Sequence, residues 1–170
     1  SLELIHPDGR PGFQINCGLS PHSHVVRKRS LNLYFQLEFG PGKLHYPLFA
    51  DAPLHGDSAV DEFDRLVLRA GQNDSWQSTS YQGNSARFAT YTRDQIVRDT
   101  LLSVAGFGGH GTYTHLYLNG FYWGLYNLVE RPDDNFDASY FGGADTNWFA
   151  VNMGGPIDGD PTRFNAMHSF

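Results

Sequence analysis

Regular alternation of apolar and polar residues is the clearest structural signal in this chain. In residues 30–39 every odd position is Leu or Phe, while Ser, Asn, Gln, Glu and one Tyr occupy the even positions. This period-two pattern predicts a strand with one buried face. Residues 115–118 and 121–129 are also rich in β-forming residues, and Asn119-Gly120, which joins them, favours a type I′ turn. We therefore expect an antiparallel hairpin.

The second strand of this hairpin is expected to lie inside a sheet. Both of its faces are largely apolar, which is typical of a strand that has neighbours on each side. Glu130 ends it, because Pro132 has no N–H with which to continue a ladder.

The remaining periodicity predicts shorter strands and one main helix. Residues 2–6, 13–17 and 63–68 are apolar runs bounded by turn residues, whereas residues 18–24 are predicted to be a loop. Residues 92–104 carry apolar side chains at helical spacing with charged residues opposite, and Gly106 follows as a stop signal.

The C-terminal region gives a weaker signal. Residues 133–141 are compatible with a short helix, and residues 142–170 show no clear periodicity. Together the elements predict an α+β fold, in which a twisted, mostly antiparallel sheet is accompanied by one main helix at about residues 92–104.

Composition limits the classes of function. A length of 170 residues and 40% hydrophobic residues fit one domain with a core. The net charge of -6 argues against nucleic acid and anionic membranes as partners. Cys17 is the only cysteine, which excludes an internal disulfide, and no apolar run reaches the roughly 18 residues of a spanning helix. The chain does not start with Met, and we therefore expect a mature product or a piece of a longer chain.

Three local patterns could carry chemistry, and each has a plainer interpretation. The basic run Arg27-Lys28-Arg29 precedes the strand at 30–39, where it could reach a phosphate or could simply deter edge pairing. His22 and His24 could bind zinc, but no further ligand pair accompanies them, and a surface loop is favoured. The Asn73-Asp74 pair is either metal-facing or part of a turn, and the turn is favoured.

Common catalytic motifs are absent from the sequence. The chain has no G-x-S-x-G, no P-loop and no Rossmann glycine pattern. The residues alone therefore identify no catalytic and no metal-binding group.

Several blocks resemble the CotH family, atypical protein kinases first known from bacterial spore coats. The hairpin block L-Y-L-N-G-F-Y-W-G-L-Y-N-L-V-E-R at residues 116–131 is the most specific of them. It is accompanied, in the family's order, by K-R-S at 28–30, G-P-G-K-L-H-Y-P-L-F at 40–49, L-V-L-R-A-G-Q-N-D-S-W at 66–76 and Y-T-R-D at 91–94.

The resemblance implies a nucleotide-binding first lobe at residues 1–145, with 146–170 as the start of a second lobe or an irregular tail. ATP and Mg²⁺ would be the cofactors. Lys28 would bind phosphate, and Glu130 and Arg131 would lie at a hinge where backbone groups meet adenine. In place of the family's Gly-rich loop, residues 18–24 contain one glycine and a proline.

The resemblance also implies a second lobe that carries the magnesium-binding aspartates in a Trp-Asp-x-Asp-like context. The sequence ends at Phe170 before such a motif. We therefore expect this chain to bind nucleotide without transferring phosphate, and to associate with a second lobe or with itself through an apolar face near Trp123.

Other classes of function remain open. The alternatives are a non-catalytic surface or assembly module and a β-rich carbohydrate- or protein-binding domain, the latter suggested by Trp76, Trp148 and the many tyrosines. The resemblance favours a bacterial envelope, spore or secreted location, and it leaves the protein substrate unknown.

Overall fold

The protein is an α+β structure that divides into two compact units. The computed structural model describes residues 1–22, 28–71, 74–76, 88–152 and 155–168. The first unit spans Ser1–Glu130 and the second Arg131–Phe170. The described residues form mostly antiparallel sheets and three α-helices, one of which is clearly the longest, so the predicted fold class is confirmed.

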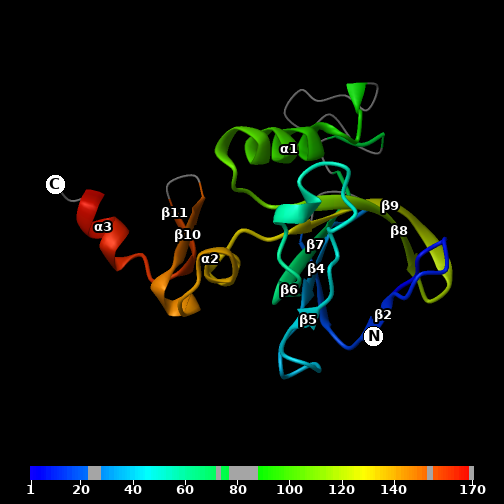
Figure 1. Cartoon of the computed structure of the whole chain (residues 1–170), viewed down its shortest axis with the longest axis horizontal. Helices are drawn as coiled ribbons and strands as arrows, with labels where there is room; N and C mark the ends of the chain where they lie inside the picture. The colour runs from blue at the N-terminus through cyan, green and yellow to red at the C-terminus, as the bar shows by residue number, and fades with distance from the viewer. Residues whose placement is uncertain (23–27, 72–73, 77–87, 153–154, 169–170) are drawn as a thin grey trace. The chain divides into compact units, whose positions relative to one another are not determined.

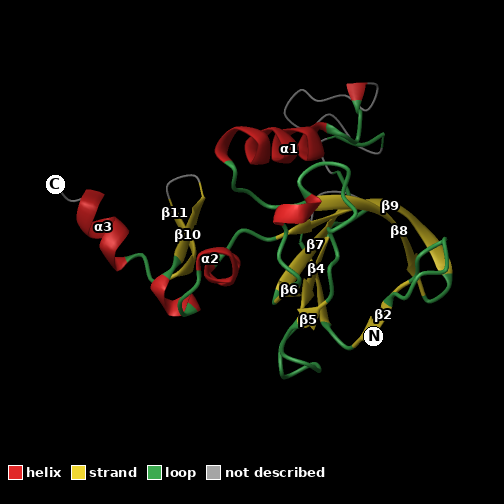
Figure 2. Ribbon diagram, viewed as in Figure 1, coloured by secondary structure: helices red, strands yellow, loops and turns green. Residues whose placement is uncertain are grey.

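A five-stranded antiparallel sheet forms the centre of the first unit (Figures 1 and 2). In spatial order its strands are β3 (Gly18–Pro21), β4 (Leu31–Tyr34), β7 (Arg65–Arg69), β9 (Phe121–Glu130) and β8 (Gly111–Leu118). The chain makes the first three strands, then helix α1 (Arg93–Ala105), and then the β8–β9 hairpin. Because β9 inserts between β7 and β8, the strand with two apolar faces is internal, as predicted.

One face of this sheet carries the hydrophobic core. Small hairpins accompany the sheet: β1 (Leu2–Leu4) pairs with β2 (Phe13–Ile15), and β5 (Leu44–His45) pairs with β6 (Glu62–Phe63). Their apolar side chains pack against alternate residues of the central strands. The buried cluster consists of Leu33, Phe35, Leu44, Phe49, Phe63, Leu66, Leu68, Ala70, Leu116, Tyr126 and Leu128.

The turn of the long hairpin has the geometry that the sequence predicts. Asn119 and Gly120 have φ of 51° and 82°, so both take the left-handed conformation of a type I′ turn. Leu118 is paired with Phe121 across it. Nearer the sheet, the register shifts between Leu116 and Tyr117.

Two strand predictions need correction. The strand expected at 30–39 ends at Tyr34, because the Phe35 N–H bonds to Asp64 O (2.8 Å) and the Phe39 N–H then closes a turn onto Gln36 O (2.9 Å). Residues 18–21, expected in a loop, form β3 instead. Periodicity did not reveal this edge strand, since it is only four residues long and contains a proline, which an edge tolerates.

Helix α1 ends as predicted but presents the opposite side to the sheet. Gly106, with φ of 68°, supplies the left-handed C-cap. The predicted apolar stripe, however, is exposed, and Gln95 and Arg98 reach the sheet instead. The polar side chain of Asn127 on the sheet face beneath the helix explains this reversal, because it bonds to both Gln95 and Arg98. The exposed members of the stripe are Ile96, Val97, Leu101 and Val104.

The second unit begins with a well-capped helix. The Asp133 carboxylate accepts a hydrogen bond from Phe136 N (3.0 Å) and starts α2 (Asp134–Phe141), which confirms the short helix expected there. The following residues, which showed no periodicity, form a turn, a hairpin and a helix: η3 (Asp145–Asn147), β10 (Phe149–Asn152), β11 (Gly155–Gly159) and α3 (Thr162–His168). The lobe boundary near residue 145 stays a prediction. None of the described helices could span a membrane.

Replacing Gly120 by Ala tests the turn. The substitution adds a methyl group that meets no atom within 4 Å, so its cost is the left-handed conformation alone, about 1–2 kcal/mol. We expect a lower urea midpoint for the unfolding of the first unit. Gly42→Ala is the control in the same unit, because that glycine has no positive φ and its added Cβ would meet only the exposed side chain of Leu37. Equal effects of the two substitutions would contradict the role of the turn.

Candidate functional site

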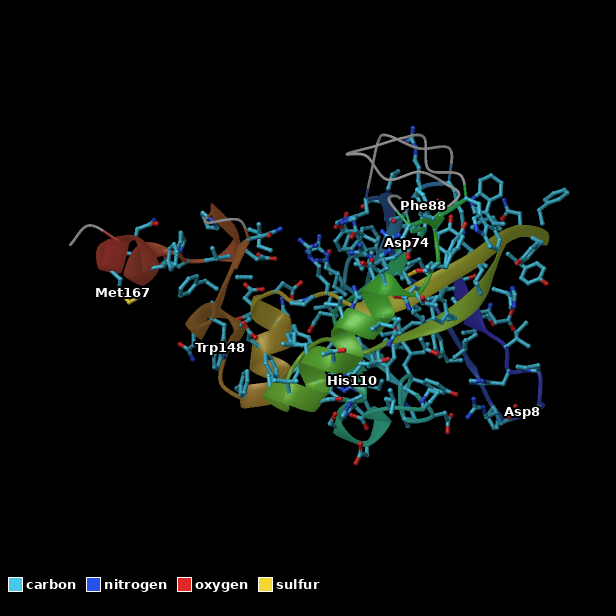
Figure 3. All side chains as sticks on the ribbon, turned by 90° about the horizontal axis from the view of Figure 1, so that it is seen from above. Asp8, Asp74, Phe88, His110, Trp148 and Met167 are labelled. Atoms are coloured by element: carbon cyan, nitrogen blue, oxygen red, sulfur yellow. The ribbon has the colours of Figure 1, made fainter. Side chains whose placement is uncertain are left out.

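A shallow pocket lies where β7 ends and α1 begins. Strand alternation places Leu66 and Leu68 in the core and therefore directs Arg69 to the opposite face, where α1 packs. The pocket is lined by Arg69, Asp74, Tyr91, Asp94, Tyr113 and Asn127. Figure 3 shows the labelled Asp74 in the densely packed region near one end of α1.

Arg69 and Asp94 form the central ion pair of this pocket. Arg69 Nη2 lies 2.5 Å from Asp94 Oδ2, and both side chains are a little over one-third exposed. The Arg69 Nε atom is buried and has no hydrogen-bond partner among the described residues. The guanidinium is thus held in place by one carboxylate and retains an unused donor.

A second guanidinium adds positive charge beside this pair. Arg98 Nη1 donates to Asn127 Oδ1 (3.3 Å), and Asn127 Nδ2 donates in turn to Gln95 Oε1 (2.9 Å). Burial, followed by the charge of Arg69, lowers the pKa of Arg98. The main cause is the removal of Arg98 from water, and an anion bound nearby would oppose the shift.

Asp74 stabilises the start of α1. Its Oδ1 accepts from Thr90 N (2.8 Å), and its Oδ2 accepts from Thr90 Oγ1 (3.1 Å) and Arg93 N (3.3 Å). The Asp74 N–H also donates to Gly71 O (3.1 Å), which agrees with the turn interpretation. These bonds occupy both carboxylate oxygens, so the geometry does not favour a metal-binding role. Asn73, the other member of the predicted pair, lies outside the described residues.

Lys28 lies beside the same pocket. Its ammonium group donates to Leu125 O, beyond the last β7–β9 pair, and lies 4.4 Å from the ring centroid of Tyr126. It is also 5.4 Å from the centroid of Tyr91, a pocket residue. Burial lowers the pKa of Lys28, so the group is partly removed from water. Its neighbour Gly124 leaves room for it, since a Cβ there would approach Lys28 Cε to 3.3 Å.

Glu130 occupies a different environment. It is 3% exposed, and its Oε2 accepts from His110 N (2.6 Å) and lies 2.9 Å from His110 Nδ1. His110 Nε2 is in turn 2.9 Å from Ser58 Oγ. Glu130 alternates along β9 with Tyr126 and Leu128, at every second position, so its side chain lies on the same face as theirs, the core face.

Within the first unit, the structure separates Lys28 from Glu130. Glu130 lies five residues along β9 from the carbonyl that Lys28 contacts, a span of about 17 Å. Arg131 begins the second unit. Their binding roles stay predictions.

No metal site is formed by the described residues. They contain no group of three or more His, Cys, Asp or Glu side chains suited to holding an ion. The expected histidine loop can be assessed only at His22, because Ser23 and His24 are not among these residues.

These features define a class of protein. It is an α+β domain in which three strands, a helix and a hairpin surround a polar pocket lined by one arginine and two aspartates, Asp74 and Asp94. The family model described as CotH kinase protein matches residues 23–169, which is most of the chain. The chain therefore belongs to the CotH kinase family. No curated protein and no solved structure matches it.

Sequence reasoning did not select the central residues of the pocket. Arg69 follows Arg65 and Val67 at alternate positions of a strand, a pattern that separates it from the core leucines. Asp94 and Arg98 are spaced i, i+4 on a helix, which puts them on one side. Both signals are in the sequence, but neither shows that this face of the strand and this side of the helix contact each other.

The buried His110–Glu130 contact is expected to contribute to folding. Replacing Glu130 by Gln removes a charged acceptor that is hydrogen-bonded to both the backbone and the ring of His110, and should destabilise the first unit by about 1–3 kcal/mol. Glu62→Gln is the control, because its contact with Lys43 is partly exposed and should contribute less than about 1 kcal/mol. Urea unfolding at neutral pH measures both, and similar losses would contradict the structural role of Glu130.

Proposed function

We propose that this chain carries the nucleotide-binding part of a CotH-type protein kinase, which transfers phosphate from ATP to protein Ser or Thr. The observation that supports this most directly is the Arg69–Asp94 pair with a second, partly buried guanidinium, that of Arg98, beside it. Family membership provides the kinase-related context.

The position of the pair is consistent with phosphate binding. Protein kinases use a basic residue on the third strand, paired with an acidic residue on the following helix, to position the phosphates of ATP. Here β7 is the third strand of the five-stranded sheet in chain order, α1 follows it, and Arg69 and Asp94 are paired. Arg69 Nε is buried and has no hydrogen-bond partner among the described residues, and a guanidinium can bind two phosphate oxygens at once.

Lys28 has a supporting role in this proposal. It lies on the connection between β3 and β4 and approaches the pocket through Tyr91. An ammonium held by one carbonyl and two aromatic rings is only partly hydrated, so less water must be removed when it meets a phosphate.

The adenine would meet the backbone where β9 ends. Glu130 N already donates to His110 O (3.1 Å), and the Glu130 carboxylate is bonded to His110. We therefore assign the direct contact to the Arg131 backbone and the fixing of its position to Glu130. Magnesium would neutralise the phosphates, but no ligand for it is assigned among these residues.

Two basic variants test phosphate binding. Arg69→Met and Lys28→Ala should each weaken ATP binding about tenfold, since each removes a charge-assisted contact. Isothermal titration of the 170-residue chain with ATP, with and without Mg²⁺, measures the effect. Lys43→Ala is the control, because Lys43 is paired with Glu62 and Asp64. If the Lys28 and Arg69 variants bind ATP as the parent chain does, the phosphate assignment is wrong.

Phosphoryl transfer by the 170 residues alone is not expected, because they contain no Trp-Asp-x-Asp-like motif. Incubation with labelled ATP, Mg²⁺ and a mixture of Ser- and Thr-containing peptides should give no more label than a reaction without protein. Labelling that disappears on chelation of Mg²⁺ would overturn this expectation. The same family membership leads us to propose a bacterial envelope, spore or secreted setting.

A further inference from the structure

The distal part of the β8–β9 hairpin exposes a group of aromatic side chains. Tyr117, Phe121, Tyr122 and Trp123 are 60%, 75%, 55% and 51% exposed, respectively. Leu118, between them in sequence, is partly buried and packs against the core. The hairpin therefore has a covered face and an open face, and Tyr117 lies on the open one.

Three rings form an aromatic row on the open face, in which Tyr122 contacts both His115 and Tyr117 with the ring planes tilted by 45° and 52°. The ring centroids of Tyr117 and Tyr122 are 5.3 Å apart, and those of His115 and Tyr122 are 5.6 Å apart. His115 Nδ1 lies 3.0 Å from Tyr122 OH, which fixes the orientation of both rings. His115 and Tyr117 are alternate residues of β8, about 6.8 Å apart along the strand.

The backbone holds this row rigidly. Tyr117 pairs with Tyr122, whereas Leu116 pairs with Gly124, so Trp123 is an extra residue in β9. A bulge of this kind redirects a side chain without ending the ladder. The rings are therefore presented by paired strands rather than by a loop.

The hairpin segment that carries these rings has no charged side chain of its own, although the Lys28 ammonium bonds to the carbonyl of Leu125, which pairs with His115. Residues 100–129 contain no Asp, Glu, Lys or Arg. Nucleic acids and anionic lipid surfaces are bound through clustered Lys and Arg, which this segment lacks. Its chemistry fits an uncharged ligand that offers both apolar faces and hydroxyl groups.

We propose that the row formed by His115, Tyr117 and Tyr122 binds a neutral polysaccharide chain. A pyranose ring presents a face of C–H groups, which stacks on an aromatic ring, and a rim of hydroxyls, which bonds to tyrosine hydroxyls and imidazole nitrogens. Tyrosine suits this use because a large, rigid ring loses little conformational entropy on binding. A row of rings, rather than a single ring, matches an extended polymer.

Two other partners could occupy this surface, and the experiments described below distinguish them from a polysaccharide. β8 is the outer strand of the sheet and has no Lys or Pro, so it could pair with β8 of a second copy. Exposed Trp and Tyr could also lie at the surface of an uncharged bilayer. The polysaccharide is favoured because the contacting rings lie on the sheet face and their polar groups line one row.

Affinity electrophoresis of the 170-residue chain tests the proposal. The gels contain hydroxyethylcellulose, xylan or galactomannan, with dextran sulfate as the anionic comparison. We expect retardation by at least one neutral polymer, no dependence on salt, and an apparent Kd about tenfold higher for Tyr117→Ala and for Tyr122→Ala. The Tyr→Phe variants should lose less affinity than the Tyr→Ala variants, because they keep the ring that stacks on the sugar and lose only the hydroxyl's hydrogen bonds.

Phe88→Ala is the matched control. Phe88 is as exposed as these tyrosines but precedes α1, so its removal should leave retardation unchanged. Circular dichroism verifies that every variant is folded.

Three results would overturn the proposal. The first is no retardation by any neutral polymer, and the second is equal retardation of the parent chain and a Tyr117→Ala/Tyr122→Ala variant. The third is a chain that does not bind polysaccharide but either forms a dimer in sedimentation or binds phosphatidylcholine vesicles, with that dimer or that binding lost in the Tyr117→Ala variant. ATP titration of the same variants should be unchanged, which separates this surface from the nucleotide pocket.

Discussion

The placement of β9 between β7 and β8 is the constraint on which the rest of the structure depends. Its backbone is paired on both sides, and its side chains alternate between two different environments. Tyr126 and Leu128 enter the hydrophobic core on one face, while Asn127 bonds to Gln95 and Arg98 of α1 on the other. A shift of one residue would put Asn127 in the core and an apolar ring under the helix, so the register is strongly specified.

The polar contact between α1 and the sheet explains why charge gathers at one end of β7. A helix that packed its apolar side on the sheet would bury Ile96 and Val97 and leave Asp94 and Arg98 in water. In the observed arrangement these charged groups meet Arg69 and Asn127, where hydrogen bonds compensate part of their lost hydration. In our proposal, the two guanidinium groups gathered at this end of β7 give the pocket its affinity for anions.

One hairpin thus serves two chemically different surfaces. Its base lies beside cationic groups from β7, α1 and the β3–β4 connection, whereas its end carries neutral aromatic rings. The bulge at Trp123 separates the two regions, and next to it Gly124 leaves space for Lys28. A domain of a kinase family could in this way hold a nucleotide at the base of the hairpin and contact its surroundings at the tip.

The sequence by itself determined the elements whose signals are local. The Asn119-Gly120 turn, the internal position of β9 and the ends of α1 follow from backbone conformational preferences and from periodicity, and so does the α+β class. The strand at 30–39 was too long because its alternation continues past the point where Phe35 bonds to Asp64 instead of to a neighbouring strand. Likewise, β3 depends on pairing with β4 and has little signal of its own.

Only the tertiary structure decided which residues meet. Lys28 could be singled out from the sequence, but its contacts with Leu125, Tyr126 and Tyr91 join positions far apart in the chain. The Arg69–Asp94 pair depends on which side of α1 faces the sheet, and an apolar stripe predicted the other side. Hydrophobic periodicity reports the average environment of a helix face, whereas the packing of α1 was set by specific bonds to polar residues of the sheet.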